Sequence, residues 1–65
     1  MSPERKAIID AINLGNRTTS LIAAAVDKPP KTVAKMIYKL KKLGIILVDN
    51  SGCLYLPVDN SVDSN

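Results

Sequence analysis

Histidine, tryptophan and phenylalanine are absent from this chain, and cysteine occurs once, as Cys53. Without histidine or a second cysteine, the chain alone cannot form an intrachain disulfide, a thiolate-imidazole pair or a zinc site of Cys and His ligands. Cys53 lies between Gly52 and Leu54 in a predicted strand, where we expect a small buried side chain rather than a reactive thiol. We therefore expect no metal ion and no cofactor.

Acidic residues and glycines are also few, six and three respectively. The acids show no spacing that would pair two carboxylates, and the glycines form no phosphate-binding loop, so we expect neither an enzyme nor a small-molecule substrate. The longest apolar runs, residues 21–26 and 45–48, are far shorter than the ~20 residues that span a bilayer. The first residues lack a hydrophobic targeting segment. We expect a cytoplasmic protein that does not bind membranes.

The length of the chain allows only one domain, because 65 residues bury only about 60% of the surface that the unfolded chain exposes. Apolar residues make up 46% of the sequence, which is enough for a packed core. We expect this domain to cover residues 1–57. Residues 58–65 contain too few apolar side chains to fold, and we expect a disordered acidic tail there.

Three helices are predicted, over residues 3–14, 18–26 and 30–43. Ser2 and Thr18 are suitable N-caps, Pro30 suits a first helical position, and Gly15 and Gly44 can end a helix. Residues 27–30 form a turn, since two consecutive prolines remove backbone donors and disfavour helix before them. The predicted core residues are Ile8, Ile9, Ala11 and Ile12 in the first helix, Leu21, Ile22, Ala25 and Val26 in the second, and Val33, Met36, Ile37, Leu40 and Leu43 in the third.

After Gly44 the apolar pattern changes to two β-prone runs, residues 45–48 and 53–57, around a turn of Asp, Asn, Ser and Gly. This pattern predicts a β-hairpin. The predicted fold class is therefore α+β, with three helices and a C-terminal two-stranded β-hairpin.

The formal net charge of +3 is concentrated in one segment. Six lysines lie within fifteen residues that contain no acid: Lys28, Lys31, Lys35, Lys39, Lys41 and Lys42. At 100° per residue, four of them lie opposite the apolar stripe of the third helix, with Tyr38 beside them: Lys31, Lys35, Lys39 and Lys42. Such lysines can simply be solvated. Here, however, no acid is placed to form i,i+4 pairs, and a local excess of positive charge attracts polyanions.

Residues 18–46, TTSLIAAAVDKPPKTVAKMIYKLKKLGII, resemble the helix-turn-helix of winged-helix regulators such as the MarR, ArsR and Lrp families. The hairpin after them resembles the wing of those families. The matching positions are Thr18, Ile22, Ala23, Val26, Thr32, Val33, Leu40, Gly44 and Ile45.

This resemblance implies a winged helix-turn-helix domain that binds double-stranded B-form DNA and places its third helix in the major groove. It implies that Lys31, Thr32, Lys35 and Lys39 face DNA, with Thr18 and Thr19 near a phosphate at the start of the second helix. Together with the neighbouring lysines and the tyrosine, the candidate DNA-binding residues are Thr18, Thr19, Lys28, Lys31, Thr32, Lys35, Tyr38, Lys39 and Lys42.

The third helix departs from many DNA readers, because it contains no Arg, Asn or Gln for two-point recognition of guanine or adenine. Direct readout would rely on lysine, threonine and Tyr38, so we expect modest specificity. Residues 45–65 contain no Lys or Arg, so the wing has no cation for the minor groove. Asp49 in the hairpin turn is expected to repel phosphate mildly.

Residues 30–38 are also similar to the helix of Zα domains, which bind left-handed nucleic acid. Lys35 and Tyr38 match that family. Ala34 stands where the family has an asparagine, and the hairpin lacks the family's Pro-Pro-x-Trp element.

Besides binding of left-handed nucleic acid, two functions remain open. The first is a small transcription regulator from a bacterium, an archaeon or a mobile element such as a phage, bound to DNA through the third helix. The second is a protein-interaction or dimerisation module that uses the hairpin, since residues 45–48 are apolar on both faces of their strand. A homodimer would be compatible with both, because a symmetric dimer reads two half-sites one helical turn apart.

Overall fold

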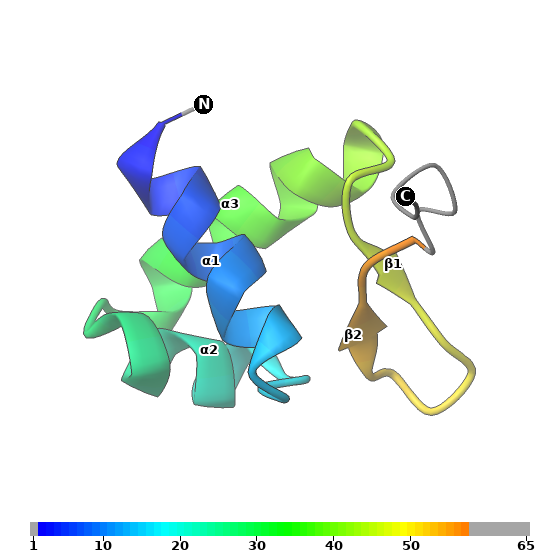
Figure 1. The fold of residues 1–65 in the computed structure, drawn as a ribbon, viewed down its shortest axis with the longest axis horizontal. Coiled ribbons are helices and arrows are strands. Elements are labelled where there is room, and N and C mark those ends of the chain that lie inside the picture. Colours follow the sequence, from blue (N-terminus) through cyan, green and yellow to red (C-terminus); the bar gives the residue numbers. More distant parts are fainter. Residues whose placement is uncertain (1, 58–65) are drawn as a thin grey trace, which may run out of the picture.

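Three helices precede one short hairpin in the computed structural model, which describes residues 2–57 (Figure 1). The helices are α1 (Pro3–Asn13), α2 (Thr19–Val26) and α3 (Pro30–Lys42), and the strands are β1 (Leu47–Val48) and β2 (Leu54–Tyr55). The strands are antiparallel, with Leu47 opposite Tyr55 and Val48 opposite Leu54. The predicted α+β class is confirmed. The predicted tail over residues 58–65 lies outside the described residues, within which no helix is long and apolar enough to cross a membrane.

The helices begin where the sequence predicts. The Ser2 hydroxyl accepts a hydrogen bond from the Arg5 backbone N–H at 3.3 Å, and the Thr18 hydroxyl accepts one from the Leu21 N–H at 3.2 Å. Each bond satisfies a donor that a helix start otherwise leaves free. The N-cap of α3 is Pro29, which makes no side-chain capping bond, and the fixed φ of Pro30 suits the first helical position.

The turn between α2 and α3 depends on one left-handed residue. Asp27 has a φ of 56°, and its N–H and that of Lys28 return to carbonyls in the last turn of α2. This conformation ends α2, and the two prolines that follow start α3 in a new direction. Gly44 ends α3 in a similar way with a φ of 77°, a value that residues with a Cβ adopt rarely.

The core lies where the three helices and the hairpin meet. Ten apolar side chains are buried there: Ile8, Ala11, Ile12, Ile22, Ala23, Val33, Ile37, Leu40, Ile46 and Leu54. Every helix contributes at least two of them, and Ile46 and Leu54 join the hairpin to the helices. Met36 and Val26 pack against this core and are half-buried, as is Ile9.

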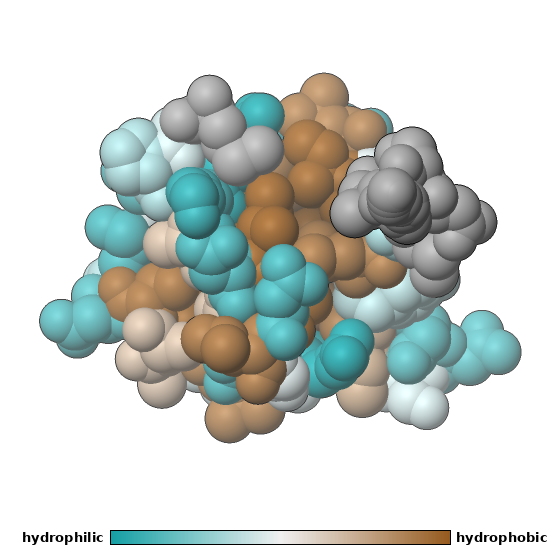
Figure 2. All heavy atoms as spheres, in the orientation of Figure 1, coloured by the Kyte–Doolittle hydropathy of each residue, from teal (hydrophilic) through white to brown (hydrophobic). Residues whose placement is uncertain are grey.

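Three predicted core residues lie at the surface instead. Leu21 is 51% exposed, Leu43 is 61% exposed and Ala25 is exposed. Because α2 has only two turns, its buried side is narrow and uses Ile22 and Ala23 instead. Leu43 is the C-cap of α3, at the edge of the stripe, where the neighbouring elements no longer cover the helix. Figure 2 shows a hydrophobic surface over this end of α3 and the segment that leads into β1.

The hairpin is shorter than predicted. The backbone N–H groups of Ile45 and Ile46 both point to the Leu40 carbonyl, at 2.9 and 3.4 Å, so these residues close α3 instead of pairing in a strand. Cys53, predicted to be buried, is half-buried just before β2. The Asp49 carboxylate accepts hydrogen bonds from the Ser51 and Cys53 N–H groups, both at 2.9 Å, and so shapes the turn.

A backbone contact holds β2 against the loop between α1 and α2. The Leu54 N–H donates to the Arg17 carbonyl at 2.8 Å, and Nη1 of Arg17 donates to the Leu54 carbonyl at 3.4 Å. Strand β2 thus has hydrogen-bond partners on both edges, β1 on one and Arg17 on the other. A two-stranded hairpin alone is only marginally stable, so this contact and the burial of Leu54 fix its position.

Ile22 is fully buried, so small changes at this position should cost stability. We expect Ile22→Val to lower the free energy of unfolding by about 0.5–1.5 kcal/mol, because a buried methyl group is lost. The control is Leu14→Ala, since Leu14 is 83% exposed and its truncation should change stability by less than about 0.5 kcal/mol. Urea denaturation followed by circular dichroism measures both. Equal losses in the two variants would contradict this packing.

Candidate nucleic-acid interface

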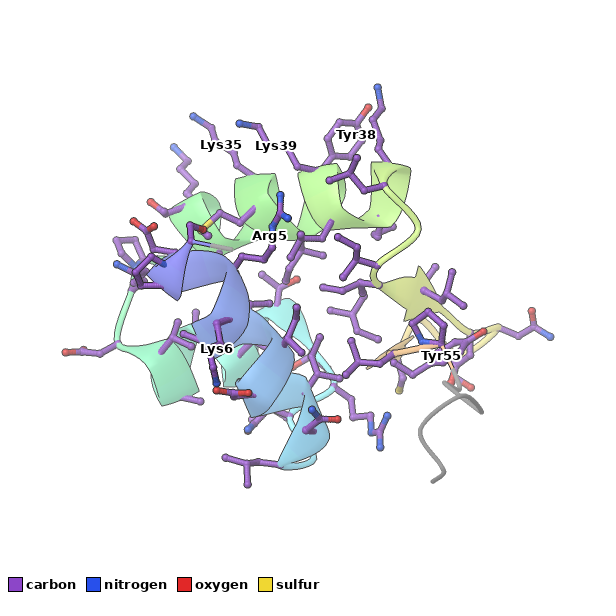
Figure 3. All side chains as sticks on the ribbon, turned by 45° about the horizontal axis from the view of Figure 1, so that its top comes forward. Arg5, Lys6, Lys35, Tyr38, Lys39 and Tyr55 are labelled. Atoms are coloured by element: carbon purple, nitrogen blue, oxygen red, sulfur yellow. The ribbon has the colours of Figure 1, made fainter. Side chains whose placement is uncertain are left out.

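The side of α3 that faces away from the core carries its positive charge. Val33, Ile37 and Leu40 are buried, whereas the four side chains opposite them are all exposed: Lys31, Lys35, Tyr38 and Lys42. We call these four residues the lysine face. Figure 3 shows Lys35, Tyr38 and Lys39 projecting from α3 away from the rest of the molecule. Arg5 and Lys6 come from α1, on the other side of α3 in this view.

No acid neutralises these cations within residues 2–57. The salt bridge found there joins Lys6 Nζ to the Asp10 carboxylate at 2.9 Å, between exposed side chains one turn apart on α1. The lysines of α3 form no such pair among the described residues. Their ammonium groups therefore create a concentrated positive potential above one surface of the domain.

Tyr38 is the large aromatic side chain of this surface, and it is 59% exposed. The Lys42 ammonium lies 5.1 Å from the centroid of its ring, within the range of a cation-π interaction. Tyr38 and its neighbours on α3 also surround a shallow hollow, lined by Ala34, Lys35, Tyr38, Lys39 and Lys42. We call it the Tyr38 hollow. Its walls are largely aliphatic and aromatic, because the lysine stems carry their charge only at the tip.

A second concavity joins the lysine face to the other elements. It lies between the start of α2, one edge of α3 and the hairpin, and we call it the wing-side groove. Its lining includes Thr18 and Thr19 from the start of α2, Ala34, Tyr38 and Lys41 from α3, and Val48 and Gly52 from the hairpin. Residues that are 34 positions apart in the sequence thus share one surface that is open to solvent.

Lys41 is a candidate that the sequence-based set missed. It lines the wing-side groove with Thr18, Thr19 and Tyr38, although it is not directly opposite the core. The signal was present in the sequence, because Ala34, Tyr38 and Lys41 are spaced i, i+4 and i+7 and so share one stripe of a helix. What the sequence did not reveal is that α2 and the hairpin lie on this side of α3.

The predicted residues do not all lie together. Thr18, Thr19 and Tyr38 meet at the wing-side groove, and Lys31, Lys35 and Lys42 occupy the lysine face with Tyr38. Lys39 borders both the Tyr38 hollow and a cleft beside α1 that includes Arg5 and Met36.

The remaining two predicted residues lie elsewhere. Thr32 is seven residues before Lys39, hence on the same stripe of α3, and is exposed. Lys28 is half-buried in the turn between α2 and α3, beside Ser20 and Pro30.

Two observations revise the expected wing. Asp49 is used within the hairpin turn, where its carboxylate accepts two backbone N–H groups, so its charge is partly compensated. The cation at the hairpin is Arg17, which comes from the loop before α2 and reaches the Leu54 carbonyl. The sequence-based set omitted Arg17 because it precedes the helix-turn-helix segment and lies 37 residues from its hairpin partner.

The fold has relatives among solved structures. One is an O-methyltransferase (NcsB1) from neocarzinostatin biosynthesis in complex with S-adenosyl-L-homocysteine, with 24% identity over 83% of this chain and 18% of that chain and a TM-score of 0.73. A second structure of that enzyme, with S-adenosylmethionine and 2-hydroxy-5-methyl naphthoic acid, has the same identity and a TM-score of 0.72 over 17% of its length. No family model and no curated protein matches this chain.

The likeness shows the fold alone. This chain spans less than a fifth of the enzyme that it matches.

The family suggested by the sequence is wrong, because the solved structures that match this chain belong to a different class of protein. The resemblance to MarR, ArsR and Lrp regulators, and the weaker one to Zα domains, is overturned by structural matches to O-methyltransferases. The physical reason lies in the matching positions: Thr18 is a cap, Ile22 and Val33 are core residues, and Gly44 ends a helix. Any domain with this arrangement of three helices needs such residues there, so they specify the fold and not the family.

The Thr18 hydroxyl should stabilise the domain as a cap. We expect Thr18→Ala to lower the free energy of unfolding by about 1 kcal/mol, because the Leu21 N–H loses its acceptor. Thr18→Ser keeps the oxygen and should stay within a few tenths of a kcal/mol of the native chain. Urea denaturation of the three proteins tests this. If Ala and Ser are equally stable, the capping bond contributes nothing.

Proposed function

We propose that residues 3–57 act as a winged helix-turn-helix module that binds double-stranded B-form DNA, with α3 in the major groove and the hairpin as the wing. The observation that carries this proposal is the lysine face, an exposed helix surface whose cations have no acidic partner among residues 2–57. A helix with its side chains fits the width of the major groove, and lysines at its margins can reach phosphates on either side.

The arrangement of the neighbouring elements supports the same proposal. The wing-side groove places the start of α2 beside Lys41, so a phosphate there would meet backbone N–H groups, the Thr19 hydroxyl and an ammonium group. Lys31 and Lys35 are on the adjacent stripe, nearer to the start of α3. The DNA backbone would then pass along the wing-side groove while α3 enters the major groove.

The side-chain chemistry favours affinity over sequence discrimination. Contacts between lysine and phosphate position a protein on DNA without reading its sequence, and α3 has no Arg, Asn or Gln to add bidentate base contacts. We therefore propose a small transcription regulator of modest intrinsic specificity.

The salt dependence of DNA binding tests this assignment. Each phosphate neutralised by a cation adds about −0.9 to the slope of log affinity against log salt concentration. We expect the double variant Lys35→Ala, Lys41→Ala to bind more weakly and to have a slope that is shallower by about 1.8. Fluorescence anisotropy with a labelled duplex at several salt concentrations measures the slope.

Lys6→Ala is the matched control for this measurement. Lys6 is also an exposed cation, but it is on α1 and its ammonium is paired with Asp10 at 2.9 Å. We expect its slope to equal that of the native chain. If both variants leave the slope unchanged, or change it equally, α3 is not the DNA-binding surface.

A second candidate function is self-association through the outer side of the hairpin. Val48 is paired with Leu54, which is buried against the core, so this pair is on the inner side of the hairpin. The neighbouring pair, Leu47 and Tyr55, is therefore on the outer side. Leu47 is 37% exposed and Tyr55 is half-buried, and exposed Leu43 is close in sequence at the end of α3. A second copy of the chain could cover these apolar side chains around a two-fold axis.

Sedimentation analysis tests this second function. We expect Leu47→Glu to shift the native chain from dimer towards monomer, because it places a charge in the apolar contact. Leu14→Glu is the control, since Leu14 is a more exposed leucine that lies just after α1, outside the hairpin, and its replacement should leave the dimer intact. A native chain that stays monomeric at all concentrations would contradict self-association without affecting the DNA-binding proposal.

A further inference from the structure

An apolar strip crosses the centre of the charged surface. Ala34 and Tyr38 lie one turn apart on α3, and both are exposed. They line the Tyr38 hollow on one side and the wing-side groove on the other. Cations border the strip on both sides, with Lys35 and Lys42 at the hollow and Lys41 at the groove. The charged surface is therefore apolar along its centre and cationic on both sides.

The position of Tyr38 is defined by its neighbours. The Lys42 ammonium lies 5.1 Å from the ring centroid, a contact that restrains the ring against α3. Ala34, with only a methyl group, lets another molecule approach the helix backbone one turn earlier. The pair thus presents one aromatic surface and one small recess, both largely apolar, between the flexible ammonium groups.

Duplex DNA has one apolar group in its major groove that matches such a strip. Phosphates at the groove margins are anionic, and the base edges carry hydrogen-bond donors and acceptors, except for the C5-methyl group of thymine. Alanine and aromatic side chains are suited to contact with this methyl group. The lysines on each side of the strip would meet phosphates at the two margins while the strip faces the bases.

We propose that Tyr38 and Ala34 recognise thymine, by packing the Tyr38 ring and the Ala34 methyl against the C5-methyl group of a thymine in the major groove. This inference rests on the proposed function, since it requires α3 to enter the groove. It adds a specificity determinant to a helix that has no Arg, Asn or Gln. The readout comes from the ring and not from the tyrosine hydroxyl.

Replacement of thymine by deoxyuridine tests the inference, because it removes the methyl group and leaves base pairing unchanged. The probe is the duplex that the full chain selects from a random library at near-physiological salt, synthesised with deoxyuridine at each thymine in turn. We expect the affinity to fall about fourfold at one or two central positions, which corresponds to one methyl-sized group removed from a buried contact. Deoxyuridine elsewhere in the duplex should have no effect.

Variants of Tyr38 assign the effect to its ring. Tyr38→Phe should keep the fourfold preference for thymine, because it retains the ring, whereas Tyr38→Ala should lose most of the preference, because only the Ala34 methyl still contacts the thymine methyl. Circular dichroism and the slope of affinity against salt show whether Tyr38→Ala is still folded and still bound through its lysines. Equal loss of the preference in the Phe and Ala variants would assign recognition to the hydroxyl and overturn the inference.

The remaining outcomes separate the inference from the proposed function. If the native chain binds both duplexes equally, with its salt dependence intact, thymine recognition is wrong and DNA binding stands. A selected sequence without thymine at its centre would likewise contradict thymine recognition and leave DNA binding standing. If the native chain selects no duplex from the library at near-physiological salt, DNA binding itself is wrong, and the inference fails with it.

Discussion

Burial of one side of α3 is the constraint on which the rest of the structure depends. Val33, Ile37 and Leu40 are almost fully buried, and each such side chain contributes about 1.5–3 kcal/mol relative to exposure. A helix cannot turn these residues inward without turning outward those about 180° away. Its lysines are therefore exposed by the same packing that stabilises the domain, and the charged surface cannot rotate without losing the core.

The other elements determine what surrounds that exposed surface. Asp27 and the two prolines after it set the direction of α3 relative to α2, so the start of α2 opens onto one edge of α3. The hairpin reaches the same edge because Ile46 and Leu54 are buried in the core and the Leu54 backbone pairs with Arg17. These two restraints produce the wing-side groove. As a result, one long side of α3 borders α2 and the hairpin, and the other does not.

Local rules allowed most of the fold to be predicted. The caps at Ser2 and Thr18, the start of α3 at Pro30 and the left-handed Gly44 all follow from near neighbours in the sequence. Errors arose where apolar spacing alone does not decide, either because no packed element covers a residue or because the backbone bonds elsewhere. Leu21 and Leu43 have the spacing of core residues, but no packed element covers them, and residues 45 and 46 bond to Leu40 instead of extending β1.

The candidate site was predictable to a similar extent. Periodicity alone placed Lys31, Lys35 and Lys42 on one exposed side, but it gave Lys39 the same weight, although Lys39 is at the edge near α1. Lys41 and Arg17 were missed because the sequence does not show that Lys41 lies beside α2 and the hairpin, or that Arg17 contacts Leu54. The family was misjudged for a related reason, since the matching residues are those that specify helix ends and core.

Amide chemical shifts during titration with a DNA duplex test most directly whether the exposed side of α3 is where DNA binds. We expect shift changes concentrated in residues 18–42, strongest around Tyr38 and Lys41, with α1 near Lys6 almost unchanged. Changes confined to α1 or to the outer side of the hairpin, or no changes at all, would contradict it.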